Sequence, residues 1–505
     1  MTKGFLCTST EPVVETTLGK LRGFRLDDIY HFYGIQYGKA GRFEQPVFPD
    51  KWEGVKDALA YGEICYPMHA DQPGGDLFVP HRFWPKSENC LNLNIWTPSI
   101  EKDAQKPVMV WLHGGGMSDG SAIEMLAYDG RNLAEYGDVV VVTVNHRLNV
   151  FGFLNLSHYD ELYHNSQNCG IADLVLALKW VHENIAAFGG NPDNVTIFGQ
   201  SGGGKKVTSL MQVPSAAGLV HKAIIESGTG PSMEKTYYED TSWITDKMLE
   251  EIGASNVKEL VHMPVQELME LVNKVAPNQY WGPIENDWFG KTIYHGATEV
   301  SKSIPLLVGT NIGEFGSFGF SVPGRQNMTK EEKEQAVIAR YGEEKGRKLL
   351  DLFYNAYPDH DALDAVVLDD GTRGTTLALC DLRAEQNAAD TYTYVFAYDF
   401  PVDDGKAAWH CAEIPYVFRN MDRAAYANTE DGERLQDQFS GFWVNFARTG
   451  NPNGRNLPYW EPYTKGHEVT MIIDRECRTA VNYDKELIEY HKQLNDELKA
   501  PDMLM

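Results

Sequence analysis

Cysteine is scarce in this sequence. The 505 residues include seven cysteines, an odd number without C-x-x-C spacing, at positions 7, 65, 90, 169, 380, 411 and 477. Disulfide scaffolds and zinc sites use cysteines that are denser or paired in spacing. We therefore expect reduced thiols in a cytoplasmic protein, and no cysteine-based metal site.

Long apolar runs are also missing. Nowhere do about 18 apolar residues stand together, as a membrane-spanning helix requires. The first residues, MTKGFLCTSTEPVVETT, lack the apolar run of about 7 to 15 residues that marks a secretory signal. We expect a soluble protein that is neither exported nor inserted into a membrane.

Basic residues are outnumbered by acidic ones. The sequence has 45 lysines and arginines against 71 aspartates and glutamates, a formal net charge of −26. Such a surface repels nucleic-acid phosphate and anionic membranes, so we expect a small-molecule partner and no nucleic acid. Fixed-period repeats and Pro/Ser-rich linkers are absent too. Residues 1–505 are therefore expected to form one domain, as a monomer or small homo-oligomer.

What the sequence does contain is a series of short apolar runs separated by helical patterns such as residues 172–188. This alternation predicts an α/β fold, a mostly parallel central sheet with helices on both faces. Residues near 232–300 and 325–385 are expected to be helical excursions with solvated charged faces. The expected strands are residues 107–112, 139–144, 194–199, 222–227, 304–309 and 391–398.

The segment TIFGQSGGGKKV, residues 196–207, fits two motifs with different chemistry. Residues 199–205 fit the phosphate-binding G-x-x-x-x-G-K, and residues 199–203 fit the hydrolase nucleophile motif G-x-S-x-G. A phosphate loop needs Ser or Thr after its lysine to bind magnesium, and Lys206 stands there instead. The hydrolase interpretation is therefore favoured, with Ser201 as the nucleophile.

The surroundings of Ser201 suit a sharp strand-to-helix turn. NVTIFG precedes it as a strand, and helix-compatible residues follow. Gly199 and Gly203 are expected because a Cβ there would collide with the neighbouring strand or helix. The HGGG of residues 113–116, after an apolar strand, and Gly202, at a helix N-terminus, would supply amides to an oxyanion.

A serine nucleophile needs a base and an acid, in the chain order Ser, acid, His. His410 follows the strand of residues 391–398 and is the preferred base, whereas His360 and His491 are expected to be solvated. Glu314, after IPLLVGTNIG, is one candidate for the acid. Pattern alone leaves two rivals open, Glu226 after the fourth strand and Asp399 after the sixth.

With these residues in place, the sequence resembles the type-B carboxylesterases, a family of α/β-hydrolase fold that includes cholinesterases, bacterial p-nitrobenzyl esterases and the inactive neuroligins. Among these members, it most resembles the bacterial p-nitrobenzyl esterases. The resemblance runs from about residue 14 to 475 through SENCLNLNIWTP, NHRLNVFGFL, NPDNVTIFGQSGGG, GTNIGE, HCAEIPYVF and FARTGNPNG. It implies a triad of Ser201, Glu314 and His410, and an oxyanion hole formed by Gly115, Gly116 and Gly202.

The resemblance also implies supporting roles. Ser227 matches a serine that supports the acid, and Glu413 matches a carboxylate near the histidine. Gln200 stands where cholinesterases have a glutamate, which makes a choline ester a poor substrate candidate. The pairs Arg42 with Glu88 and Arg147 with Asp173 match structural ion pairs.

Two further expectations concern cysteine and lysine. Cys65 and Cys90 fall where secreted relatives form a disulfide, and we expect them reduced though close. Lys205 stands where a small residue is usual, at a helix end whose dipole disfavours a cation. We expect Lys205 to pair with a buried carboxylate, such as Glu226.

The function that the resemblance implies is hydrolysis of carboxylic esters through an acyl-enzyme on Ser201, with no metal and no cofactor. The same triad could serve an acyltransferase or a lipase. A catalytically silent binding module is the alternative from another class, and it is disfavoured because every catalytic position is filled.

Overall fold

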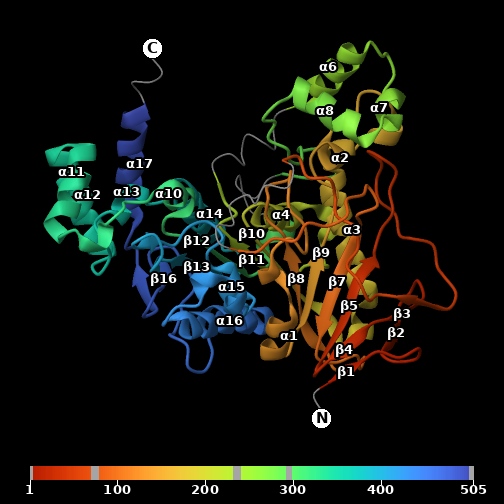
Figure 1. The fold of residues 1–505 in the computed structure, drawn as a ribbon, viewed down its shortest axis with the longest axis horizontal. Helices are drawn as coiled ribbons and strands as arrows, with labels where there is room; N and C mark the ends of the chain where they lie inside the picture. Colours follow the sequence, from red (N-terminus) through yellow and green to blue (C-terminus); the bar gives the residue numbers. More distant parts are fainter. Residues whose placement is uncertain (1–3, 70–78, 231–239, 292–297, 500–505) are drawn as a thin grey trace.

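The centre of the molecule is a twisted sheet of twelve strands with helices on both sides (Figure 1). The computed structural model describes residues 4–69, 79–230, 240–291 and 298–499. In spatial order the strands are β1 (Phe5–Leu6), β4 (Phe24–Leu26), β5 (Ile29–Gln36), β7 (Asn92–Thr97), β9 (Val140–Val144), β8 (Lys106–Leu112), β10 (Gly190–Gln200), β11 (Lys222–Glu226), β12 (Leu306–Asn311), β13 (Thr391–Phe396), β16 (Val469–Ile473) and β17 (Arg478–Val481).

All six strands predicted from apolar runs are present, as β8 to β13. The strands from β9 to β16 in spatial order pair in parallel. The strands at the two edges of the sheet, from β1 to β7 and at β17, pair antiparallel. The α/β-hydrolase fold class is therefore confirmed, with antiparallel strands added at both edges.

Strand β8 shows why the central strands appear as continuous apolar runs. Val108, Val110 and Leu112 pack into the core on one face of the sheet, and Met109 and Trp111 pack into the core on the other. Successive side chains of a strand point to opposite faces, so a strand covered on both sides must be apolar at every position.

Helices cover both faces. On one face lie α3 (Cys169–Asn184) and α4 (Gly202–Gln212), and on the other lie α1 (Arg131–Gly137) and α16 (Gly432–Thr449). Helix α17 (Lys485–Lys499) follows the edge strand β17. The helix expected at residues 172–188 is α3 followed by a 3-10 turn, Ile185–Phe188. Among the described residues, no helix is long and apolar enough to span a membrane.

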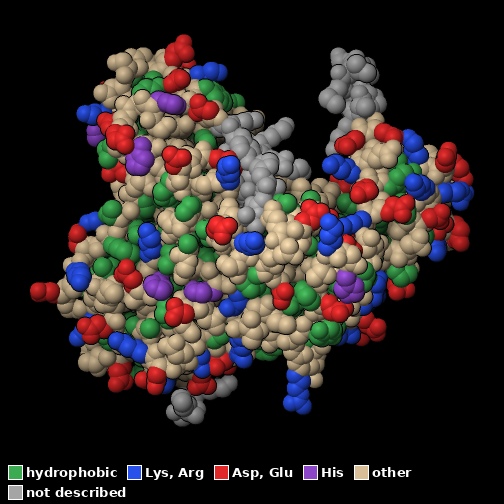
Figure 2. All heavy atoms as spheres, turned by 180° about the vertical axis from the view of Figure 1, so that it is seen from behind, with side chains coloured by type: hydrophobic (Ala, Val, Ile, Leu, Met, Phe, Trp, Pro, Cys, Tyr) green, Lys and Arg blue, Asp and Glu red, His purple; other side chains and the backbone are tan. Residues whose placement is uncertain are grey.

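The two stretches expected to be helical contain most of the remaining helices. Most of these helices form two lobes that stand apart at one end of the molecule (Figures 1 and 2), whereas the last helix of the second stretch packs against β12 and β13. On the face in Figure 2, acidic and basic side chains are interspersed. The first stretch contains α6 (Ser242–Ile252), α7 (Lys258–His262), α8 (Val265–Val275) and α9 (Glu299–Lys302); the second contains α11 (Lys330–Tyr341), α12 (Glu343–Ala356), α13 (Asp364–Val367) and α14 (Gly371–Glu385).

Parallel strands β8, β10, β12 and β13 end at one edge of the sheet, and the motifs that follow them therefore lie near one another.

The shorter elements complete the chain. The helices α2 (Asn149–Phe153), α10 (Glu314–Gly319) and α15 (Ile414–Val417) follow strand ends. Two small sheets consist of β2 (Val13–Glu15), β3 (Lys20–Arg22) and β6 (Val55–Asp57), and of β14 (Asp399–Phe400) and β15 (Lys406–Ala407).

Candidate active site

Ser201 occupies the sharp turn between β10 and α4. Its φ of 58° and ψ of −123° lie in a region that L-residues other than glycine rarely adopt. The backbone N–H of Ser201 donates to the carbonyl oxygen of Glu226 at 2.8 Å, which ties the turn to the end of β11. Such a strained turn, held by its neighbours, is typical of a nucleophile presented at a sheet edge.

The two motif glycines are explained by backbone contacts. A β-carbon on Gly199 would lie 2.6 Å from the carbonyl oxygen of Leu112, and one on Gly203 would lie 1.9 Å from the same atom. Neither distance is possible without movement of the backbone. The prediction that a side chain at these positions would collide with a neighbouring element is confirmed.

The HGGG loop packs directly against the start of α4. Gly115 and Gly116 have φ values of 84° and 63°, and a β-carbon on Gly202 would lie 2.3 Å from the carbonyl oxygen of Gly116. Within the described part of the chain, the amides of these three glycines donate to no protein acceptor. They are therefore available to a ligand at the junction of the loop and the helix.

Glu314 and His410 are in direct contact. Glu314 Oε2 lies 2.5 Å from His410 Nδ1, so the imidazole carries its proton on Nδ1 and donates it to the carboxylate. The other oxygen, Oε1, accepts hydrogen bonds from Ser227 Oγ at 2.6 Å and from the backbone N–H of Asn311 at 2.7 Å. Three donors thus converge on one buried carboxylate and fix its orientation toward the imidazole.

The two rival acids lie elsewhere. Glu226 accepts a hydrogen bond from Trp443 Nε1 at 2.7 Å, and burial, together with the charge of Glu413, raises its pKa well above the usual range. Asp399 lies beside His360, with 3.7 Å between its Oδ2 and the imidazole Nδ1. Of the three acids left open by pattern, Glu314 is the one that contacts His410.

Glu413 and Asn311 form a layer behind the acid. Asn311 Nδ2 donates to Glu413 Oε2 at 2.6 Å, while its backbone amide donates to Glu314. Burial and the nearby charge of Glu314 raise the pKa of Glu413 to about 7. The supporting role of Asn311 was not foreseen, although its place just after a predicted strand was a usable signal.

Gln200 and Phe315 contact the histidine from two further elements. Gln200 Nε2 lies 3.4 Å from His410 Nδ1, and Gln200 Oε1 accepts a hydrogen bond from the thiol of Cys411 at 3.1 Å. The imidazole therefore lies beside the residue that precedes Ser201. The ring of Phe315, 62% exposed, has its centroid 4.1 Å from that of His410 and forms an apolar surface next to it.

Three expectations about single side chains were wrong. Lys205 does not pair with Glu226; its ammonium lies 4.5 Å from the ring centroid of Tyr280, and burial lowers its pKa to about 8. His491 is buried and lies 2.8 Å from Asp370, and His360 is nearly buried and lies 3.0 Å from Asp474. Both histidines stand in segments rich in charged residues, but contacts with residues distant in sequence bury them. Pattern alone does not reveal such contacts.

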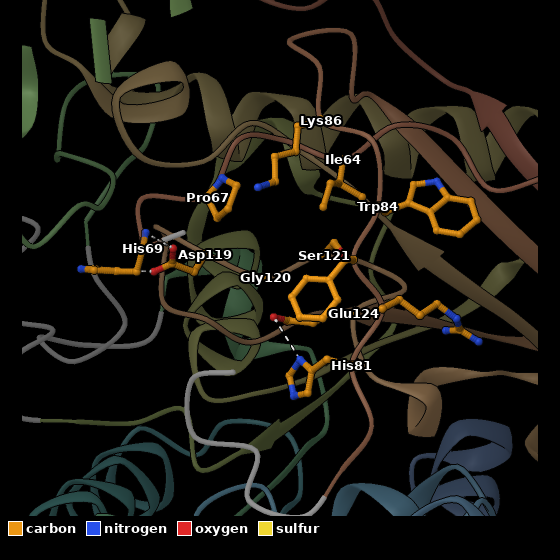
Figure 3. Close-up of a pocket in the computed structure, with 12 residues that line it drawn as sticks. Ile64, Pro67, His69, His81, Trp84, Lys86, Asp119, Gly120, Ser121 and Glu124 are labelled. Carbon is orange, nitrogen blue, oxygen red and sulfur yellow. Dashed lines mark hydrogen bonds and ion pairs between the residues drawn. The ribbon is translucent and has the colours of Figure 1, made fainter. Parts of the chain in front are cut away.

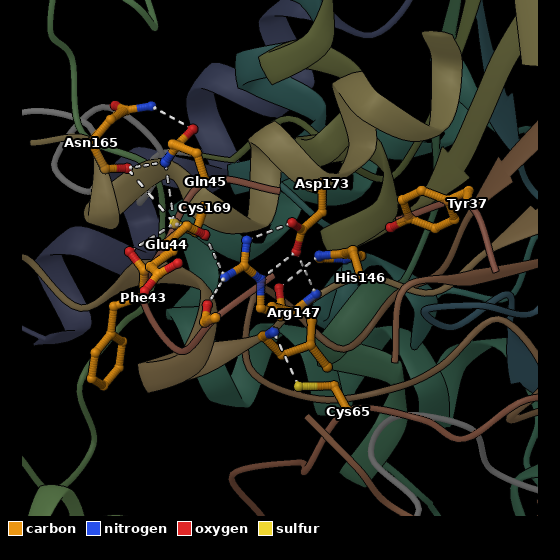
Figure 4. Close-up of polar contacts among 12 residues, drawn as sticks. Tyr37, Phe43, Glu44, Gln45, Cys65, His146, Arg147, Asn165, Cys169 and Asp173 are labelled. Carbon is orange, nitrogen blue, oxygen red and sulfur yellow. Dashed lines mark hydrogen bonds and ion pairs between the residues drawn. The ribbon is translucent and has the colours of Figure 1, made fainter. Parts of the chain in front are cut away.

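The two expected ion pairs are present. Arg42 contacts both carboxylate oxygens of Glu88, at 2.8 and 2.5 Å. Arg147 contacts both oxygens of Asp173, at 2.6 and 2.8 Å, and donates to the carbonyl oxygen of Glu44 at 2.8 Å (Figure 4). The Arg147 pair is fully buried and anchors the loop after β9 to α3.

Cys65 and Cys90 are free thiols, both buried. Contact with the Cys65 thiol, followed by burial, raises the pKa of Cys90 well above its usual range. The two thiols are thus close and unbridged, as expected.

One group of described residues could hold a metal ion. His360, Asp364 and Asp399 have ligand atoms within 4.8 Å of one another. The group includes neither Ser201 nor His410, so it is separate from the contacts around His410.

Comparisons with known proteins show the family to which the chain belongs. The model of the carboxylesterase family matches residues 10–491. A para-nitrobenzyl esterase of Bacillus subtilis (strain 168) is 34% identical over 92% of this chain and 96% of its own length.

Solved structures give the same result. A Clostridium hathewayi esterase that can hydrolyse aliphatic aromatic polyesters has a TM-score of 0.93 and 42% identity, and the match covers 98% of this chain and 100% of that one. A Geobacillus stearothermophilus carboxylesterase has a TM-score of 0.72 and 31% identity, over 95% of this chain and 99% of its own. The chain belongs to the carboxylesterase family and is a serine hydrolase of carboxylic esters.

Proposed function

We propose that Ser201, His410 and Glu314 are the nucleophile, the general base and the orienting acid of this esterase. The observation that carries the assignment is the chain of contacts from Ser227 and Asn311 through Glu314 to His410 Nδ1. It leaves His410 Nε2 as the basic nitrogen, on an imidazole that lies beside the Ser201 turn.

Acylation follows from this arrangement. His410 Nε2 takes the hydroxyl proton of Ser201 as the serine oxygen attacks the ester carbonyl, and the carbonyl oxygen becomes an oxyanion. The amides of Gly115, Gly116 and Gly202 donate to that oxyanion, and each such donor lowers the barrier by about 3 to 4 kcal/mol. The tetrahedral intermediate collapses, and His410 protonates the departing alkoxide, which leaves as the alcohol.

Deacylation repeats the same proton transfers with water. His410 Nε2 accepts a proton from water, the hydroxide attacks the acyl carbonyl, and the oxyanion forms at the same three amides. Collapse of this second intermediate returns the proton to Ser201 and releases the carboxylic acid. Glu314 stays ionised throughout and stabilises the imidazolium that forms in each half of the cycle.

The assignment is tested by covalent labelling. A fluorophosphonate should add to the intact protein once, with the label on the peptide that contains Ser201, and p-nitrophenyl ester hydrolysis should show a burst of alcohol. Ser201→Ala should remain folded, take no label and lose esterase activity. An unlabelled, folded wild-type protein would refute the triad.

For the substrate, we propose esters with an aromatic group on the acyl or alcohol side. Phe315 forms an exposed apolar surface against His410, and relatives are described as acting on para-nitrobenzyl esters and aliphatic aromatic polyesters. A hydrolysis panel that varies acyl length against alcohol bulk tests this. Benzoate and benzyl esters should have a higher kcat/KM than aliphatic esters of equal size, and Phe315→Ala should reduce that preference.

We also propose a cytoplasmic, single-domain enzyme that acts as a monomer or small homo-oligomer. The buried free thiols of Cys65 and Cys90 support a reducing compartment. Cell fractionation tests the location, and sedimentation of the purified protein tests the assembly state.

A further inference from the structure

Lys206 is a buried cation behind the loop that carries Gly115 and Gly116. It is the fifth residue of α4, and its side chain is completely buried. Its Nζ donates to the carbonyl oxygen of His113 at 2.8 Å, and His113 directly precedes the three glycines. Lysine is rarely buried without an acidic partner, because removing the charge from water is costly.

The nearest carboxylates act on this ammonium only from a distance. Asp119 and Glu124 both favour the charged form of Lys206, yet among the described residues neither forms an ion pair with it. Figure 3 shows where these carboxylates point instead. Asp119 lies 2.8 Å from His69 Nδ1, and Glu124 lies 3.6 Å from His81 Nδ1. The charge of Lys206 is therefore weakly compensated and can act on a negative charge that develops nearby.

Two buried histidines beside Lys206 stay neutral. The rings of His113 and His146 lie 5.3 Å apart at 29°, and their Nδ1 atoms lie 2.9 and 2.8 Å from the carbonyl oxygens of Gly114 and Arg147. Burial, and then the charge of Lys206, lowers the pKa of both well below the usual range. Of these three bases, Lys206 is the one that is positively charged at pH values just below neutral.

The charge of Lys206 is itself sensitive to pH. Burial lowers its pKa to about 7, against the opposing influence of Glu124 and Asp119. Below that pH the ammonium is present behind the loop, and above it a neutral amine remains. The amine can still donate an N–H to the His113 carbonyl, so deprotonation removes the positive charge and keeps the hydrogen bond.

We propose that Lys206 is a positioning residue for the oxyanion hole: it holds the His113 carbonyl, and through it the Gly115 and Gly116 amides, and places a positive charge behind the oxyanion. The inference rests on the proposed function, because it requires an oxyanion at those amides. A fixed charge in a water-poor site stabilises the oxyanion more than the neutral ester carbonyl. Its contribution therefore falls on kcat and not on substrate binding.

The test compares two neighbouring lysines. Lys206→Met removes the buried charge, and Lys205→Met makes the same substitution one residue earlier, away from the His113 carbonyl. With a p-nitrophenyl ester at pH 6, Lys206→Met should lower kcat by about 10- to 100-fold and leave KM within about twofold. The ratio of wild-type to variant kcat should shrink from pH 6 to pH 9, as the wild-type ammonium loses its proton. Lys205→Met should keep the wild-type pH profile.

Lys206→Gln keeps a hydrogen-bond donor but removes the positive charge. It serves for the same comparison if Lys206→Met does not fold. It should recover part of the lost kcat at pH 6, with the same shrinking ratio. A folded variant with wild-type kcat at pH 6, or a loss that is constant from pH 6 to pH 9, would overturn the proposal. Fluorophosphonate labelling of wild-type Ser201 distinguishes this outcome from failure of the proposed function.

Discussion

Gly203 and Leu112 are in direct backbone contact, so close that a β-carbon on Gly203 would lie 1.9 Å from the carbonyl oxygen of Leu112. Leu112 ends β8, and Gly203 stands in the first turn of α4. The contact joins the Ser201 turn to the start of the HGGG loop. The position of Ser201 relative to the amides of that loop therefore depends on glycine at residue 203.

Gly203→Ala should destabilise the protein by about 4 kcal/mol or more, because backbone atoms that cannot yield meet the added methyl group. Urea unfolding and soluble yield measure the effect. Gly374→Ala in α14 is the matched control: its β-carbon would lie 3.7 Å from Ile488, an ordinary contact, so helix propensity should stabilise it by about 0.5 to 1 kcal/mol. Equal midpoints for wild type and Gly203→Ala would contradict the contact.

Ser227→Ala should lower kcat by about tenfold, because it removes one of the two donors that hold the Glu314 carboxylate against His410. KM and melting temperature should change little. Ser440→Ala deletes a buried hydroxyl that donates within α16, and it should leave kcat unchanged. If both serine variants show the same kcat, Ser227 does not position the acid.

Glu413→Gln should change how stability depends on pH. The folded protein holds a proton on Glu413 up to about pH 7, whereas the unfolded carboxyl loses it near 4.5. The contribution of Glu413 to the wild-type free energy of unfolding therefore falls as pH rises from about 4.5 to 7 and is constant above that. Across this pH window, the unfolding free energy of Glu413→Gln should rise relative to that of the wild type, as measured at several pH values.

The control for that series is Glu489→Gln, which alters an exposed carboxyl of α17. Its unfolding free energy should run parallel to the wild-type curve. A Glu413→Gln curve that also runs parallel to wild type would show that the buried carboxyl holds no extra proton.

Cys65 and Cys90 should be free thiols in cells but able to form a disulfide. Mass mapping of freshly lysed, alkylated cells should find both residues alkylated. Treatment of the purified protein with diamide should join them, because the two thiols are in contact, and the bridge should raise the melting temperature. Cys65→Ser should show no such rise. A pair that is fully bridged in fresh lysate would contradict the cytoplasmic proposal.

Much of the site was predictable because each element of it follows a strand. Burial on both faces makes the central strands read as unbroken apolar runs, and parallel strands end at one edge. Ser201, Glu314 and His410 could therefore be placed near one another from sequence order. The contact between Asn311 and Glu413 was not predictable in this way, because the two residues are distant in sequence.

The α/β fold and the turn at Ser201 could be predicted from sequence alone, because apolar strand runs and motif glycines are local properties. Pattern left Glu226 and Asp399 open beside Glu314, and the family resemblance implied Glu314. The tertiary contacts show Glu314 at His410 and Glu226 at Trp443, because the partner of an acid depends on residues distant in sequence. The same holds for the two lysines of the motif. Lys205 lies against Tyr280, and Lys206 lies behind the HGGG loop, because one helical position faces outward and the next faces the sheet.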